Sequence, residues 1–140
     1  MGSYLISAIA FTVLSIPQIG LRESVMHCSS AMEPAVDRCL KDYTVVKQGS
    51  FNILLGHSHT KFNRIKRLNV GDRFRYGRKV YKIYYRKVVF PSEIWVMDRP
   101  KDEIALMTCA WGTRRRFVIL ARDVKSSRRI QGKISKKMDR

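Results

Sequence analysis

The stretch ALMTCAWGTRRRFVIL, residues 105–120, joins two apolar runs through a short loop. The first run ends in Cys109, and after four residues three consecutive arginines open the second run. Two such runs are typical of antiparallel strands, so Arg116 is expected near the level of Cys109 across a hairpin. A cation there favours the nucleophilic thiolate and can donate hydrogen bonds to an oxyanion. The commoner role of a cysteine is that of a small core residue, and a solvated charge run explains two of the three arginines.

The rest of the chain also breaks into short runs bounded by glycine and proline. Strands are predicted from β-branched and aromatic residues over residues 9–16, 51–56, 73–76, 80–90, 94–97, 104–109 and 116–124. In the longest run, Tyr81, Ile83 and Tyr85 are expected on one face of the strand. Helical turns are expected over residues 31–40 and 62–68. Many short strands favour an all-β barrel or sandwich.

The composition fits one globular domain with a basic surface. Of the 140 residues, 45% are hydrophobic, which is enough for one packed core and is not typical of a disordered chain. The net charge of +17 predicts attraction to nucleic acid, to lipid head groups or to an anionic cell wall. Residues 1–8 are expected to be a leader or a lead-in to the barrel, residues 9–125 the folded domain, and residues 126–140 a basic, mobile tail. The longest nearly uncharged stretch, residues 4–21, is interrupted by polar residues and falls short of the roughly 20 apolar residues of a membrane-spanning helix.

A thiol nucleophile also needs an acid that protonates the leaving amine, and histidine is the usual one. His57 and His59 follow the apolar run FNILL and Gly56. His57 is the first side chain after the glycine, whereas His59 lies further into a polar loop. His27 is expected in a polar loop at the surface.

The three cysteines leave at least one thiol free, because their number is odd. The spacing of Cys28, Cys39 and Cys109 does not fit a zinc site, so no metal is expected. If the domain is exported, Cys28 and Cys39 can form a disulfide. Two unpaired thiols are at least as good an interpretation, and the sequence leaves the choice open.

Six segments, in order along most of the chain, resemble the sortases, the cysteine transpeptidases of bacterial cell surfaces. They are LSIPQIGL from Leu14, FNILLGH from Phe51, FNRIKRLNVGDRF from Phe62, YKIYYRKVVFP from Tyr81, IALMTC from Ile104 and RRRFVILA from Arg114. Each segment alone is a loose match. The combination of Gly-His, Thr-Cys and a following strand that opens with arginine is specific.

The resemblance implies a sortase-type closed β-barrel of about eight strands with one or two short helices. It implies that Cys109 is the nucleophile, His57 the catalytic histidine and Arg116 the functional arginine, and that Thr108 helps line the substrate site. The thiolate would cleave a Leu-Pro-x-Thr-Gly-type sorting motif between Thr and Gly and form a thioacyl-enzyme. The acyl group would then pass to an amine of a cell-wall precursor or a pilin. This chemistry implies no metal and no organic cofactor.

Sortases work at the extracytoplasmic face of the cell membrane, so a native anchor or signal is expected to lie outside this sequence. The basic surface would suit an anionic cell wall or membrane surface. Two other functions stay open: a catalytically inactive sortase-fold binding module, and a small basic β-barrel that binds nucleic acid through Tyr81, Tyr84 and Tyr85. A nucleic-acid partner is not expected, because it does not account for the Gly-His and Thr-Cys motifs. The sortase subclass and the exact motif are not determined.

Overall fold

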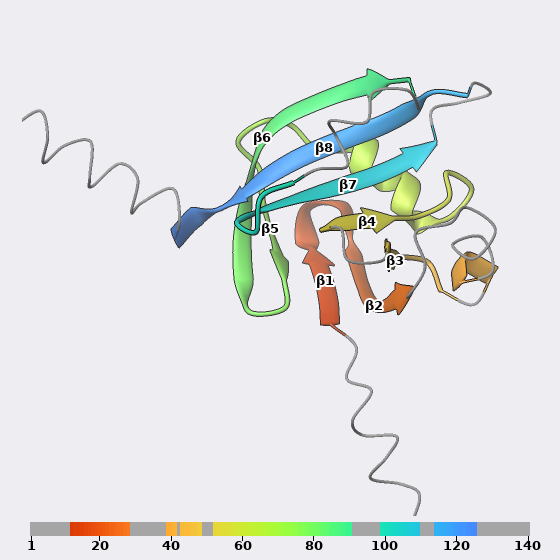
Figure 1. Ribbon diagram of the computed structural model, residues 1–140, viewed down its shortest axis with the longest axis horizontal. Coiled ribbons are helices and arrows are strands. Elements are labelled where there is room, and N and C mark those ends of the chain that lie inside the picture. Colours follow the sequence, from red (N-terminus) through yellow and green to blue (C-terminus); the bar gives the residue numbers. More distant parts are fainter. Residues whose placement is uncertain are drawn as a thin grey trace, which may run out of the picture.

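Eight short strands close into a barrel in the computed structural model, which describes residues 12–28, 39–41, 43–48, 52–90, 99–109 and 114–125. The strands, seen in Figure 1, are β1 (Thr12–Ile16), β2 (Leu21–Cys28), β3 (Val46–Gln48), β4 (Ile53–Leu55), β5 (Arg73–Tyr76), β6 (Lys79–Val89), β7 (Glu103–Cys109) and β8 (Arg116–Asp123). The 3₁₀ helices η1 (Pro17–Ile19) and η2 (Lys61–Arg67) lie between them. Around the barrel the order is β1-β2-β3-β4-β7-β8-β6-β5, and β5 pairs with β1. The expected closed β-barrel with short helices is confirmed.

Strand direction brings several strand ends to one end of this barrel. Most neighbouring strands are antiparallel, but β2 runs parallel to β3 and β4 runs parallel to β7. The chain between β4 and β7 contains η2, β5 and β6, because a parallel pair needs a long crossover connection. Strands β4, β6 and β7 therefore finish at the same end of the barrel, where β8 begins (Figure 1). We refer to it as the β7 end.

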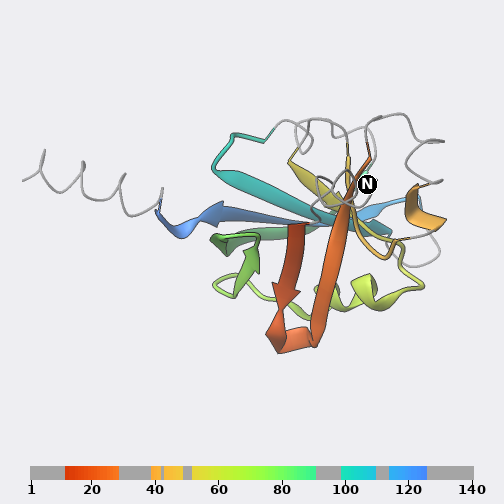
Figure 2. The same cartoon turned by 90° about the horizontal axis from the view of Figure 1, so that it is seen from below.

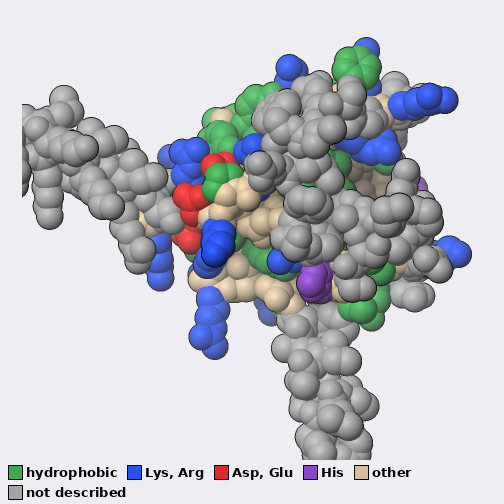
Figure 3. All heavy atoms as spheres, in the orientation of Figure 1, with side chains coloured by type: hydrophobic (Ala, Val, Ile, Leu, Met, Phe, Trp, Pro, Cys, Tyr) green, Lys and Arg blue, Asp and Glu red, His purple; other side chains and the backbone are tan. Residues whose placement is uncertain are grey.

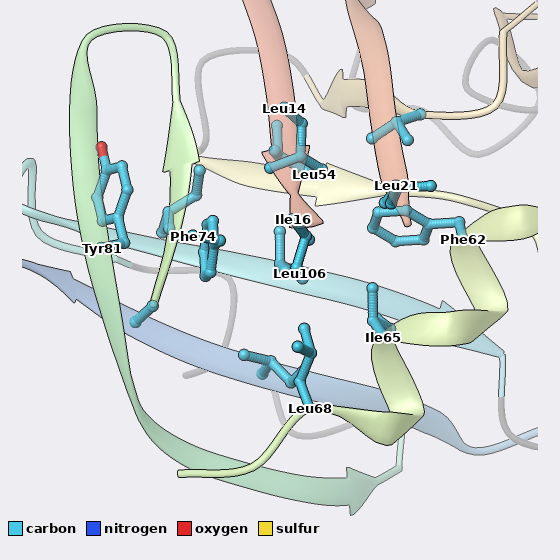
Figure 4. Close-up of a cluster of buried hydrophobic side chains, with 14 of the residues drawn as sticks. Leu14, Ile16, Leu21, Leu54, Phe62, Ile65, Leu68, Phe74, Tyr81 and Leu106 are labelled. Carbon is cyan, nitrogen blue, oxygen red and sulfur yellow. The ribbon is translucent and has the colours of Figure 1, made fainter. Parts of the chain in front are cut away.

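The barrel interior holds one large apolar cluster, part of which is shown in Figure 4. Helix η2 and the residue after it contribute Phe62, Ile65 and Leu68, which are three residues apart and so lie on one side of a helix with three residues per turn. Thr60 caps this helix, and its hydroxyl accepts a hydrogen bond of 3.3 Å from the Phe62 amide. The apolar side of η2 therefore packs inside the barrel next to β7 (Figures 2 and 4).

The outward face of the strands around β7 is apolar as well. We call this second group the outer apolar cluster; it consists of Ile53, Val89, Ala105, Met107, Val118 and Leu120, with the partly buried Leu55 and Tyr85 packed against it. When a strand is buried on both faces, its sequence is an almost continuous run of apolar residues and does not alternate between apolar and polar residues. This explains the composition of IALM in β7 and FVILA in β8.

The structure corrects three of the expectations drawn from the sequence. Strands β2 and β3 were not predicted, and His27, expected in a polar loop, lies in β2. A β-bulge shifts the register of β6 between Ile83 and Tyr85. As a result, Tyr81 and Ile83 point into the barrel, whereas Tyr85 packs on the outer apolar cluster and does not share their face.

The other predicted elements that can be compared agree to within a few residues. They are β1, β4, η2, β5, β6, β7 and β8. Residues 39–41 are helical, at the end of the helix expected over residues 31–40, and residues 31–38 lie outside the described part of the chain. The strand expected over residues 94–97, the lead-in over residues 1–8 and the tail over residues 126–140 also lie outside it.

Candidate active site

Cys109 and Arg116 face each other at the β7 end of the barrel. Cys109 is the last residue of β7, Arg116 is the first residue of β8, and the two are register partners in the antiparallel pair. In the parallel pair, Leu55 of β4 is the register partner of Met107. Strand β4 ends at Leu55, and Gly56 and His57 follow it at the end of the barrel where β7 ends in Cys109. Three of the residues that the sequence singled out therefore lie at the same end of the barrel.

Strand alternation decides which way each side chain of β7 points. Cys109 lies on the face that carries Ala105 and Met107, which belong to the outer apolar cluster. Thr108 lies on the opposite face: its side chain points into the barrel, it is 2% exposed, and its hydroxyl oxygen is buried. The structure therefore does not bring the Thr108 side chain onto the face of the thiol.

The segment after β4 holds His57 by short-range contacts. The amide of Gly56 donates a hydrogen bond of 3.2 Å to the Met107 carbonyl, which ties the end of β4 to β7. Thr60 donates to the His57 carbonyl from its amide at 3.3 Å and from its hydroxyl at 2.8 Å. The ring of His57 is half-buried and stacks on that of His59, which is exposed, with 4.9 Å between centroids. Both histidines therefore lie beside each other, and His57 is the one closer to the strand.

The three arginines before β8 have different surroundings. Arg114 and Arg115 are exposed, and Arg116 is half-buried. The Arg116 guanidinium donates from Nη1 to the carbonyls of Arg114 at 3.1 Å and Arg115 at 3.4 Å. The Arg115 guanidinium stacks over the ring of Phe90, 4.6 Å from its centroid. Arg116 is thus the arginine held in place next to the thiol, as the hairpin geometry requires.

The structure resolves the question of the other two cysteines. Cys28, at the end of β2, forms a disulfide with Cys39, with 6.2 Å between the Cα atoms, and Cys109 is a free thiol. The disulfide belongs to a small apolar cluster that includes Val46 of β3 and reaches Leu55 of β4. It therefore supports the strand that leads to His57.

A separate polar network lies at the opposite end of β7. The carboxylate of Glu103 is buried and accepts hydrogen bonds from the Tyr84 hydroxyl and from Arg99, and Arg122 lies 3.6 Å from it. Burial, followed by the hydrogen bond to Glu103, raises the pKa of Tyr84. Every member of this network has a partner, so it joins β6, β7 and β8 and is not a candidate for catalysis.

Two searches for other kinds of site concern only the described residues. In those segments, no three or more His, Cys, Asp or Glu side chains gather closely enough to hold a metal ion. None of the helices in the same segments has the length and the apolar character needed to cross a membrane.

The sequence did not point to two features of this site. The outer apolar cluster next to Cys109 could have been recognised from the unbroken apolar runs of β7 and β8, which indicate burial on both faces. Lys66 of η2, the helix that packs against β7, has a buried Nζ atom, and only its place in a basic helix marks it in the sequence.

A family model described as Sortase domain matches residues 14–124 of the chain. A search among curated proteins finds no match.

Solved sortase structures have the same fold. Sortase C1 from Streptococcus agalactiae, in a complex with MTSET, is 18% identical with a TM-score of 0.65, and the match covers 80% of this chain and 66% of that chain. Sortase C from Clostridium perfringens, in a structure with the C-terminal cell wall sorting motif, is 23% identical with a TM-score of 0.64 and coverages of 79% and 68%. The sortase D5 transpeptidase from Clostridium perfringens is 16% identical with a TM-score of 0.65 and coverages of 86% and 85%. This chain thus spans less than two thirds of the length of the Streptococcus agalactiae chain.

Proposed function

The chain belongs to the sortase family, and on this basis we propose that it is a cysteine transpeptidase whose reaction is carried out by Cys109, His57 and Arg116. The observation that carries the proposal is the strand register at the β7 end. Cys109 and Arg116 are direct partners, and β4, which precedes Gly56 and His57, ends beside Met107 of β7.

The proposed reaction is an acyl transfer in two steps. The Cys109 thiolate attacks the carbonyl carbon of the Thr-Gly bond in a sorting motif of the Leu-Pro-x-Thr-Gly type. Arg116 donates hydrogen bonds to the oxyanion that develops on this carbonyl. His57 gives a proton to the departing glycine amine as the carbon–nitrogen bond breaks, which leaves a thioester on Cys109. An incoming amine then attacks the thioester and gives a proton to His57, which forms a new amide and releases the thiolate.

The outer apolar cluster is the proposed binding surface for the apolar residues of the motif. Met107 precedes Cys109 by two residues on the same face of β7, and Val118 follows Arg116 by two residues on β8. An apolar segment of a peptide could therefore contact these side chains while its scissile bond lies at the thiol. Thr108, which points into the barrel, would support the backbone at Cys109 from the interior side.

The proposed partners are surface proteins with a sorting motif and, as acceptor, an amine of a cell-wall precursor or a pilin. The proposed place of action is the extracytoplasmic face of the cell membrane. The basic surface supports this assignment, because cell-wall polymers and lipid head groups are anionic. On the face shown in Figure 3, Lys and Arg side chains are widely spread, and Asp and Glu side chains gather in one place.

The test is incubation of the protein with a panel of sorting-motif peptides, followed by mass spectrometry. We expect peptide cleavage and a thioester on Cys109, and we expect neither with Cys109→Ala. Retained cleavage by Cys109→Ala would refute the function. A thiol that reacts with alkylating agents but with no peptide of the panel would favour an inactive sortase-fold binding module, and salt-dependent binding of oligonucleotides would favour a nucleic-acid-binding barrel.

A further inference from the structure

Three cations lie side by side on neighbouring strands, at the end of the barrel away from Cys109. Lys82 of β6 is the register partner of Arg73 of β5 on one side and of Arg122 of β8 on the other. Arg122 is in turn the partner of Glu103, the first residue of β7. Like charges directly opposite each other on neighbouring strands are destabilising. This row of cations therefore costs stability unless anions offset it.

The side chains of Arg73 and Lys82 point away from the barrel interior. Both are exposed. Their neighbours Phe74 and Tyr81 belong to the apolar cluster inside the barrel, so strand alternation turns the two cations outward. Arg75, two residues after Arg73 on β5, lies on the same outward face and is exposed as well.

A further cation extends this surface across β1. Arg75 of β5 is the register partner of Ser15 of β1, and Ser15 is the partner of Arg22 of β2. Arg22 is exposed, and the serine between the two arginines is small and uncharged. The positive surface thus reaches over four adjacent strands. We call it the basic face, which consists of Arg22, Arg73, Arg75 and Lys82.

Anionic side chains offset little of the charge of the basic face. Both ion pairs within the described segments use Glu103, which binds Arg99 and Arg122, and none involves a cation of the basic face. Asp72, which precedes β5, accepts a hydrogen bond of 2.8 Å from a backbone amide of its own turn. Glu23 of β2 is the register partner of a residue inside the barrel, so it does not share the outward face. The basic face is therefore suited to an anionic partner from outside the chain.

Exposed apolar side chains lie at the edge of the basic face. Val70 is 58% exposed, in the turn before β5. The amide of Gly71 donates a hydrogen bond of 2.8 Å to the Ile83 carbonyl, which holds this turn beside β6. Tyr84 is exposed too, and the Arg122 guanidinium lies 4.7 Å from the centroid of its ring. Cations next to exposed apolar and aromatic side chains are typical of surfaces that lie against anionic lipids, whereas a soluble polyanion needs only the cations.

We propose that the basic face binds anionic phospholipid head groups at a membrane surface, with Val70 entering the interface. Glu103, level with the row of cations, precedes Cys109 by six residues, or about 20 Å along a strand. The β5–β6 hairpin accordingly lies at the opposite end of the barrel from the tip of β7 (Figure 1). A membrane bound there leaves the β7 end open to peptides. This inference deepens the proposed place of action and rests on the proposed function in that respect alone.

The experiment measures sedimentation of the protein with vesicles of phosphatidylcholine, with and without phosphatidylglycerol. We expect binding only to the anionic vesicles, and binding that weakens as salt is added. A cation close to an anionic membrane strengthens binding about fivefold, so the triple variant Arg73→Gln/Arg75→Gln/Lys82→Gln should bind about 100-fold more weakly. The single variant Lys82→Gln, expected to bind about fivefold more weakly, serves if circular dichroism shows that the triple variant does not fold.

The matched control is Lys41→Gln/Lys61→Gln/Arg67→Gln, which removes the same charge from exposed positions outside the basic face. We expect this control to bind the anionic vesicles within about threefold of the wild type, since these positions do not face the bilayer. An equal loss in the control, or equal binding to both kinds of vesicle, overturns the proposal.

Val70→Ser separates a lipid surface from a soluble polyanion. We expect it to weaken binding to the anionic vesicles and to leave binding to soluble polyphosphate unchanged. If it changes neither while the triple variant loses both, the basic face is a site for soluble polyanions and the lipid proposal is wrong. Vesicle binding needs no sorting motif, and the triple variant should cleave peptides like the wild type. Failure of the peptide assay would therefore refute the proposed reaction without affecting this result.

Discussion

Gly56→Ala is expected to destabilise the barrel and to displace His57 at the same time. A Cβ atom on Gly56 would lie 2.5 Å from Cδ2 and Cγ of Phe62 and 2.6 Å from its Cβ. Favourable contact between carbon atoms begins near 3.5 Å, so one of the two groups has to move by about 1 Å. Phe62 is fully buried in a close-packed interior and has little room to do so.

The size of the expected loss of stability depends on which atoms of Phe62 the new methyl group overlaps. Overpacking of a core costs about 1–3 kcal/mol. Because the overlap includes the Cβ atom of Phe62 and not the end of a flexible side chain, we expect a loss of about 3 kcal/mol in the free energy of unfolding, at the upper end of this range. Any relief by movement of the backbone shifts His57, the next residue, and should lower the rate of peptide cleavage.

Urea denaturation and the peptide-cleavage assay measure the two effects. Phe62→Ala provides the control, because it removes Cγ and Cδ2, two of the three atoms that the new methyl group would overlap. In the double variant, the loss of stability should be smaller than the sum of the two single losses by about 1 kcal/mol or more. The reasoning fails if Gly56→Ala unfolds within about 0.5 kcal/mol of the wild type, or if the two single effects simply add.

Three further predictions concern the catalytic groups and the disulfide. Arg116→Lys keeps the charge but loses the planar fork of donors, so it should reduce peptide cleavage far more than Arg115→Lys; equal losses would indicate a general effect of positive charge. His57→Ala should abolish transpeptidation while His59→Ala keeps a substantial part of it, and the reverse result would make His59 the acid. Thiol counting in denaturant without reductant should find one free thiol per chain, and a count of three would exclude the disulfide.

Local patterns were sufficient to predict the strands around the thiol. The hairpin of β7 and β8 has two unbroken apolar runs and a short connection, and such a pair has essentially one way to align. That Cys109 and Arg116 lie opposite each other therefore followed from the order of the residues. The apolar spacing of Phe62, Ile65 and Leu68 likewise predicted η2.

Other elements carried no local signal that could be recognised. Strand β2 has its buried residues at Leu21, Val25 and Cys28, with intervals of four and three residues that are typical of a helix. Strand β3 is only three residues long, which is too short for any periodicity. The bulge that turns Tyr85 outward depends on the pairing of β6 with β8, and nothing in the local pattern of β6 marks it.

The linear order of the residues thus specified the thiol, its arginine partner and the glycine before His57, because these features depend on neighbours in the chain. The barrel alone decided that β4 lies parallel to β7, which is what brings the end of β4 to the same end of the barrel as Cys109. It also decided that Thr108 points inward and that Cys28 meets Cys39. These outcomes join residues that are distant in sequence or on different faces of the sheet, and they are set by strand pairing and by packing across the barrel.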